Sequence, residues 1–323
     1  MQANPVFDAY RVLPAGFTQT GNLIEGAMLG VPAENAAGPV AGKWAFDLPD
    51  ENFMFPGDIL HYYISATDTD GVEEQTATMP ASDPGMAPDG FGDFSRPLAY
   101  NSSYTVRALP TVYDDPLNPG TLITPATLFW NDFANRGGEA EWHGSFANLG
   151  LVLGRDYDCY YTNGPSSGVG NGLGGRATHL SLIDYDVMVY TAGDLGVNTI
   201  SNGDFNNDPS NDVEVVDSWL RFGGRDLFMT GDELVYDMTV NSGAATTQFV
   251  TDWMKVNYVD NDLRPLVNNQ ATPLVKALPG NGVFADTDSW VAYGGCFSIN
   301  TFDAVEADVA QGGVQLAEFT DPN

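Results

Sequence analysis

Cysteine, histidine and lysine are scarce in this chain of 323 residues. The two cysteines, Cys159 and Cys296, are too few for a disulfide framework and do not have C-x-x-C spacing. A structural zinc site and thioredoxin-type redox chemistry therefore have no support in the sequence. One bridge between the two cysteines and two separate thiols are both compatible with it.

Positive charge is equally scarce, with 12 basic residues against 43 acidic ones and a formal net charge of −31. A field of this sign repels a phosphate backbone, which excludes nucleic acid as a partner. Such an excess of acids has two explanations that can hold together. Hydrated carboxylates keep an extracellular or salt-adapted protein soluble, and Asp-rich loops hold Ca²⁺, a cation that takes oxygen ligands.

Long apolar runs are missing as well. Asp, Gly or Asn interrupts every apolar stretch before the roughly 18 residues that a spanning helix needs, so we expect no insertion into a membrane. The first five residues lack the basic and apolar regions of a signal peptide. We expect a piece of a longer polypeptide whose export signal lies outside this sequence, and hence an extracellular or cell-surface location.

The first 110 residues show the period-two alternation of half-buried strands. Trp44, Phe46 and Leu48 alternate with polar or small residues, and residues 60–66 repeat the pattern. A loop rich in Pro and Gly follows at about 80–98. The pattern predicts an all-β sandwich over residues 1–110. The segment PGDILHYYISATDTDG (residues 56–71) resembles the late strands of immunoglobulin-like and fibronectin type III modules in bacterial surface proteins.

After a linker at residues 111–123, the hydrophobic pattern changes to that of alternating strands and helices. This pattern predicts an α/β domain with a parallel sheet over residues 124–323. The predicted buried strands are residues 126–130, 185–190 and 226–229, and residues 157–161 are predicted as a more polar neighbouring strand. One helix is expected to begin at an Asn211 cap, with Glu214 reaching back, and to bury Val215, Trp219 and Phe222. A second helix is predicted over residues 246–258.

Three segments of this half resemble flavodoxin-like, class I glutamine-amidotransferase-like modules of large secreted bacterial proteins. They are LFWND (128–132), LIDYDVMVYTAGD (182–194) and WLRFGGRDLFMTGD (219–232). In catalytic amidotransferases a Cys occupies the sharp turn after the corresponding last strand, and Thr230 stands near that position here. His143 and His179 lack the companions of an amidotransferase triad, and His61 belongs to the other domain. The resemblance therefore implies a degenerate module without covalent catalysis.

The carboxyl ends of the predicted parallel strands should gather polar side chains at one edge, where open α/β sheets bind ligands. The residues of this possible crevice are Asn131, Asp132, Thr191, Asp194, Thr230, Asp232 and Glu233. Their carboxylates would repel one another unless a cation or raised pKa values relieved the repulsion, so Ca²⁺ and Mg²⁺ are candidates. The alternative is that each Asp caps a helix or a turn.

Two further groups of aspartates are candidate metal sites. Asp204, Asp208 and Asp212 space carboxylates along one loop, and Asp68 and Asp70 do so at a turn of the sandwich. Neither group has the twelve-residue EF-hand pattern. Ca²⁺ is the one cofactor that these groups suggest, and solvated turns are the alternative.

These observations favour a non-catalytic structural or adhesive portion of a larger surface protein, and leave an enzyme as a rival. The partners of such a structural or adhesive portion would be other domains of the same polypeptide or further copies of this chain. The rivals are an accessory domain of a secreted hydrolase or peptidase with an acidic metal-binding crevice, and a carbohydrate-binding module that presents aromatic side chains to surface glycans.

Overall fold

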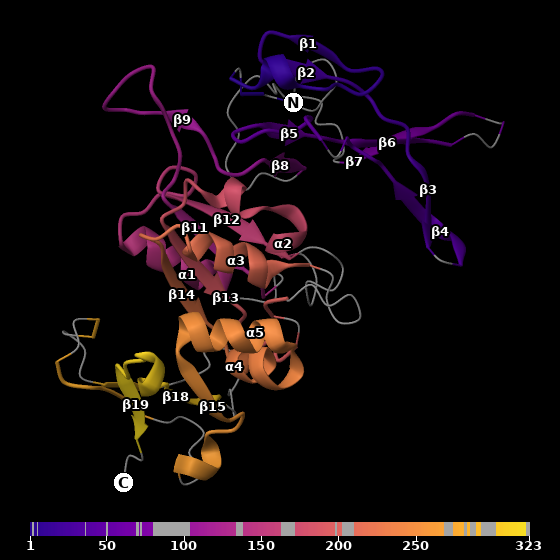
Figure 1. Cartoon of the computed structure of the whole chain (residues 1–323). Coiled ribbons are helices and arrows are strands. Elements are labelled where there is room, and N and C mark those ends of the chain that lie inside the picture. Colours follow the sequence, from indigo (N-terminus) through magenta and orange to yellow (C-terminus); the bar gives the residue numbers. More distant parts are fainter. Residues whose placement is uncertain are drawn as a thin grey trace. The chain divides into compact units, whose positions relative to one another are not determined.

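The computed structural model of the chain, drawn in Figure 1, describes residues 1, 3–4, 6–35, 37–49, 51–68, 71, 73–79, 104–133, 138–162, 172–197, 199–201, 210–267, 274–280, 283–284, 289–291 and 302–320. The predicted loop at 80–98 lies outside these residues.

The N-terminal region consists of antiparallel strand pairs, which confirms the all-β prediction at this coarser level. The pairs are β1 (Thr18–Thr20) with β2 (Leu23–Glu25), β3 (Val31–Asn35) with β4 (Gly38–Ala45), β5 (Ile59–His61) with β8 (Thr105–Arg107), β6 (Ile64–Thr67) with β7 (Thr76–Met79), and β9 (Tyr113–Asp114) with β10 (Leu122–Ile123). The last pair falls within the segment that the sequence analysis treats as a linker.

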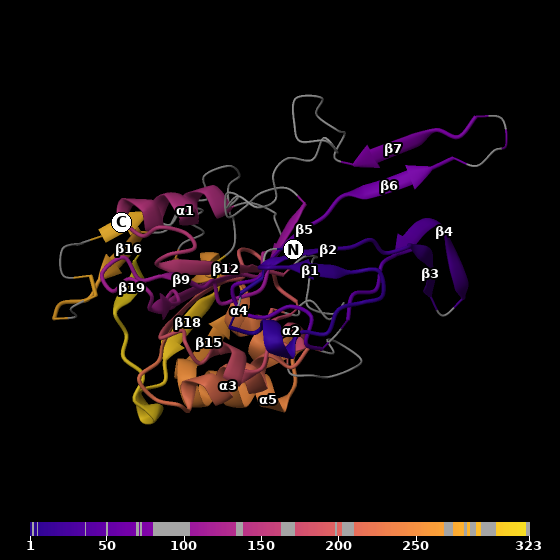
Figure 2. The same cartoon turned by 90° about the horizontal axis from the view of Figure 1, so that it is seen from above.

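Two of these pairs, β3–β4 and β6–β7, are narrow ribbons (Figure 2). The expectation that the alternation at residues 44–48 marks a buried face is wrong for Trp44 and Phe46, whereas Leu48 is half-buried against the core of unit 1. Strand β4 ends at Ala45, and Trp44 and Phe46 are 64% and 48% exposed. Period two reports that alternate side chains share a face, but it does not say that another layer covers that face.

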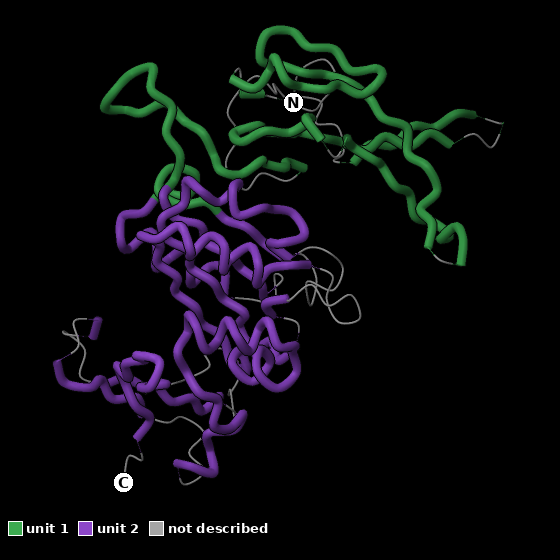
Figure 3. The backbone as a smooth tube through the Cα atoms, viewed as in Figure 1, with its two compact units in different colours: residues 1–125, 152–158 green, residues 126–151, 159–323 purple. Residues whose placement is uncertain are grey.

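The chain divides into two compact units (Figure 3). Unit 1 comprises residues 1–125 and 152–158, and unit 2 comprises residues 126–151 and 159–323.

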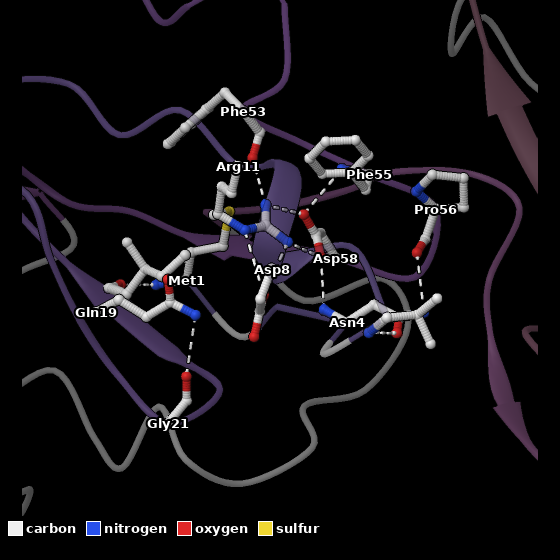
Figure 4. A network of polar contacts seen from close by, with 12 residues as sticks. Met1, Asn4, Asp8, Arg11, Gln19, Gly21, Phe53, Phe55, Pro56 and Asp58 are labelled. Atoms are coloured by element: carbon white, nitrogen blue, oxygen red, sulfur yellow. Dashed lines mark hydrogen bonds and ion pairs between the residues drawn. The ribbon is translucent and has the colours of Figure 1, made fainter.

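Unit 1 has a small apolar core around Ile24 and Phe53. Beside it, Arg11 and Asp58 form an ion pair whose two side chains are fully buried (Figure 4). Asp58 also accepts hydrogen bonds from the backbone N–H groups of Asn4, at 2.7 Å, and Phe55, at 2.8 Å. These donors satisfy the buried carboxylate and tie together segments that lie far apart in the sequence.

Unit 2 is built on the four-stranded parallel sheet, and all four predicted strands are present. The order is β12 (Tyr157–Tyr161), β11 (Thr127–Asn131), β13 (Val187–Thr191) and β14 (Asp226–Thr230). Phe129, Trp130, Met188 and Tyr190 are completely buried in it. Continuous apolar strands of this kind are typical of a sheet that is covered on both faces.

The helices of unit 2 are α1 (Glu139–Asn148), α2 (Leu173–Arg176), α3 (Asp212–Leu220), α4 (Leu234–Tyr236) and α5 (Ala244–Phe249). Helix α3 begins after Asn211, as predicted, and buries Val215 and Trp219. The Asn211 side chain makes no capping bond to the backbone and contacts the Glu214 carboxylate instead, whereas Phe222 lies beyond the helix and is 45% exposed. None of the described helices is both long and apolar enough to cross a membrane.

The predicted helix at 246–258 is wrong in its last part. Helix α5 continues as a π-helical turn to Met254, Lys255 adopts a left-handed conformation with φ of 55°, and residues 256–260 form β15 (Val256–Asp260). β15 pairs with β18 (Ala304–Ala307), and β16 (Leu274–Ala277) lies between β17 (Ser289–Val291) and β19 (Ala317–Thr320). Both of these sheets are antiparallel.

Candidate functional site

The predicted crevice residues do lie along one edge of the parallel sheet. The backbone N–H of Asp132 donates to the Thr191 carbonyl at 2.9 Å, and the N–H of Asp232 donates to the Gly193 carbonyl at 2.7 Å. Thr191 and Thr230 are register partners on β13 and β14. The carboxyl ends of β11, β13 and β14 are therefore joined side by side.

The acidic groups at this edge divide into an inner and an outer set. Asp132 belongs to the inner set, since it is fully buried and accepts a 2.8 Å hydrogen bond from the Tyr190 hydroxyl. Burial, and then the Asp132 charge, raise the pKa of Tyr190 well above its usual value, so the phenol keeps its proton. Asn131 is also buried and donates to the Glu139 carboxylate at 3.1 Å. These inner groups hold the end of β11 in place.

The outer set contains Asp194, Asp232 and Glu233 of the predicted crevice, together with Asp303, which the sequence analysis did not single out. Asp303 immediately precedes β18, and its N–H donates to Asp232 Oδ1 at 3.0 Å. Burial raises the pKa of Asp232 to about 6 and that of Asp303 to about 7, and neighbouring carboxylates add to both effects. A raised pKa is one of the two ways to relieve the repulsion between these carboxylates.

No local sequence pattern predicts that Asp303 lies beside Asp232. It lies 71 residues after Asp232, in a part of the chain for which the sequence analysis proposes no element. Only the β15–β18 pairing brings it to the sheet edge.

The turn between β14 and α4 places Glu233, rather than Thr230, in the left-handed conformation, with φ of 59°. Thr230 is the last residue of β14, and its carbonyl accepts from the N–H of Ala192 at 3.0 Å. A non-glycine residue in this conformation is strained, and a strand-to-helix turn of this kind exposes its apex residue. The side chain presented here is a carboxylate and not a thiol.

The histidines lie at separate places. His143 on α1 shares a 2.8 Å hydrogen bond with the Tyr161 hydroxyl, and burial lowers the pKa of its imidazole. His179 packs beside the ring of Phe222, and His61 is part of β5 in unit 1. The His61 ring shares a 3.4 Å hydrogen bond with the Thr105 hydroxyl, so each of the three rings has a structural neighbour.

The predicted metal-binding loops lie largely outside the described residues. Asp70, Asp204 and Asp208 lie outside the described residues, as does Cys296. Asp68 is exposed, whereas Asp212 is fully buried and accepts from the N–H groups of Gly174, at 2.6 Å, and Ser201, at 3.3 Å. Cys159 is buried in β12. Within the described residues, no three His, Cys, Asp or Glu side chains are arranged to hold a metal ion, and Ca²⁺ binding stays a prediction.

Comparison with known proteins identifies no relative of this chain. No family model, curated protein or solved structure matches this chain. The likenesses to immunoglobulin-like and amidotransferase-like modules therefore rest on the segments quoted above and on the coarse architecture.

Proposed function

We propose that the chain is a non-catalytic structural or adhesive portion of a larger extracellular or cell-surface protein. In this proposal the N-terminal strand pairs belong to an immunoglobulin-like module, and the parallel sheet belongs to a degenerate flavodoxin-like, amidotransferase-like module. The carboxylate of Glu233 at the turn after β14 supports the non-catalytic part of the second assignment, because catalytic amidotransferases carry a thiol at the sharp turn after this strand.

The observation that carries the adhesive role is the aromatic face of the β3–β4 ribbon. Trp44 and Pro32 are register partners, so they lie on the same face of the ribbon. Phe46 follows two residues after Trp44, and its ring lies so close to Gly30 that a Cβ there would approach Phe46 Cζ to 2.8 Å. Two large aromatic side chains are thus presented to solvent at neighbouring positions.

A ribbon of this kind gains little stability by itself, since an isolated two-stranded hairpin is marginal in water. Among the described residues no third strand pairs with β3 or β4. Apolar groups that gather on an exposed face are typical of an interaction site. Covering Trp44 and Phe46 would therefore stabilise both the ribbon and the complex.

The partner that we assign to this face is a second copy of this chain, because the ribbon itself has a balanced charge. The two strands carry one acid, Glu34, and one base, Lys43, and have no net charge, whereas the whole chain has −31. Lys43 alternates with Trp44 along β4 and so points to the opposite face. Two strongly acidic copies can stack these faces about a twofold axis with little local repulsion.

The test is the association of the chain with itself, measured by sedimentation equilibrium in buffer with 0.3 M NaCl. We expect a dimer, and we expect Trp44→Ser to weaken it by roughly 1,000-fold, because a twofold interface contains Trp44 twice and each central interface Trp contributes about 2 kcal/mol. Leu117→Ser is the matched control, because Leu117 is 85% exposed but lies outside the ribbon.

A monomer at all accessible concentrations, or a dimer that Trp44→Ser leaves unchanged, would contradict this assignment. A monomer that binds a polysaccharide column through Trp44 would instead assign the aromatic face to glycans.

A further inference from the structure

Strand β14 forms one edge of the parallel sheet in unit 2, and it is more exposed than the other three strands. The central strands β11 and β13 are largely buried, and β12, at the opposite edge, buries its first three residues. In β14, Asp226 is exposed and Phe228 keeps 55% of its surface accessible. Among the residues that the structure describes, no strand pairs with the outer side of β14.

The backbone of β14 directs hydrogen-bonding groups outward. The Asp226 N–H donates to the Asp186 carbonyl at 2.9 Å, and the Thr230 carbonyl also bonds toward β13. Because the hydrogen-bonding direction alternates along a strand, the backbone groups of Leu227 and Met229 face away from β13. Two N–H groups and two carbonyls therefore point toward the position of a further strand.

The centre of β14 lacks the features that usually protect an edge strand. Such strands are typically interrupted by a Lys, a Pro or a β-bulge. Leu227, Phe228 and Met229 are all apolar, and the pairing with β13 runs through the five residues of β14 without a shift of register. On one face the Phe228 ring packs against Trp142 of α1, with ring centroids 6.4 Å apart. An added strand would find a regular ladder and an aromatic surface beside it.

Acidic residues flank both ends of this apolar centre. Asp226 begins the strand, and Arg225 before it is already paired with Asp186. Asp232 and Glu233 follow shortly after the strand ends. Antiparallel pairing with a second copy of β14 would bring Asp226 of one copy to the end that these two acids flank in the other, so like charges would meet. Charge complementarity therefore favours a different strand, with a basic residue at each end.

We propose that the outer edge of β14 is a docking site for an extended segment of a partner protein, which joins the sheet as a further strand with an apolar centre and a Lys or Arg at each end. The outward backbone groups of Leu227 and Met229 hold this segment, and a β-branched or aromatic residue beside Phe228 gives it specificity. Since both ends of β14 are acidic, the charge pattern suits a parallel and an antiparallel segment alike. The proposal concerns unit 2 and does not rest on the dimer proposed for the β3–β4 ribbon.

A synthetic peptide tests the site in the full chain. The probe has alternating Val and Thr residues and one Lys at each end, and its counterpart has Glu in place of both Lys residues. Amide exchange measured by NMR at pH 7 reports on single residues. We expect the Lys peptide to slow exchange at Leu227 and Met229 by at least about tenfold, and to change Phe228 little because its N–H already faces β13. The Glu peptide should bind at least about tenfold more weakly.

Three variants separate the backbone contribution from the charge contribution. Met229→Pro removes one outward donor and leaves the bonds to β13 in place, since an edge strand tolerates Pro where the N–H faces outward. It should weaken binding of the Lys peptide at least about tenfold. Asp226→Asn should weaken binding about two- to fivefold, the effect of an exposed charge pair. Glu306→Gln, which removes a charge from an exposed position on β18, is the matched control and should change nothing.

The proposal is overturned if the Lys peptide leaves exchange at Leu227 and Met229 unchanged, if the two peptides bind equally, or if Met229→Pro folds and binds as the wild type does. It is also overturned if the two amides become protected without peptide as the concentration of the chain rises, because a second copy would then cover the edge. The exchange measurement needs no variant, so it decides the question even if Met229→Pro does not fold.

Discussion

At the scale of single residues, the ion pair of Arg11 and Asp58 shows how burial determines what the loss of one charged partner costs in stability. Both side chains are fully buried, whereas Arg221, paired with Asp217 on α3, is 61% exposed. Removing one partner of a buried pair strands the other charge in the protein interior and typically costs about 3–5 kcal/mol. Exposed helical pairs contribute below about 1 kcal/mol.

We therefore expect Arg11→Gln to lower the free energy of unfolding by about 3 kcal/mol or more. Arg221→Gln, which removes the same charge from an exposed site, should cost less than about 1 kcal/mol. Urea unfolding followed by circular dichroism would measure both. Equal losses in the two variants would show that the Arg11 network is not the buried support that its geometry indicates.

Single residues also mark the limit of sequence-based prediction here. The crevice aspartates could be predicted, because carboxyl ends of parallel strands meet at one edge. Their division into inner and outer sets could not, since it depends on which side chain Tyr190 reaches. Asp58 and Asp303 gave no signal at all, because their partners lie 47 and 71 residues away and spacing of that length carries no local period.

At the scale of elements, strand and helix types were predicted best where packing and propensity agree. The central strands β11 and β13 are nearly continuous apolar runs, and α3 buries an apolar stripe. The failure at residues 256–258 has a physical cause: Lys255 turns the chain through a left-handed conformation, and Val256, Tyr258 and Val259 then favour a strand. Helical periodicity does not report such a break.

This break gives a prediction at a single backbone position. A left-handed conformation costs a non-glycine residue about 1–2 kcal/mol, and a β-branched side chain suffers more. We expect Lys255→Gly to retain or raise the melting temperature and Lys255→Val to lower it, with at least about 1 kcal/mol between the two variants. Thermal unfolding at fixed pH would measure the difference. A Val variant as stable as the Gly variant would contradict the strain.

At the scale of the whole molecule, charge is the feature that the sequence states most clearly. The described ion pairs all use arginine, and the chain has only 12 basic residues for 43 acids. Most carboxylates therefore have no cationic side chain available to neutralise them. The fold must tolerate this repulsion, and the raised pKa values at Asp232 and Asp303 are one local response to it.

We therefore expect monovalent salt to stabilise the protein. The Debye length falls from about 10 Å at 0.1 M to about 3 Å at 1 M ionic strength, which screens repulsion between carboxylates spread over the surface. Urea midpoints at 0.1 M and 1 M NaCl, measured at pH 7.5 with a chelator, should rise with salt. A rise of roughly 1 M urea would correspond to about 1–3 kcal/mol. A flat or falling midpoint would show that surface repulsion does not limit stability.

Repeating the measurement with millimolar Ca²⁺ at constant ionic strength separates the two explanations of the acidic composition, because only bound ions would then raise the midpoint further.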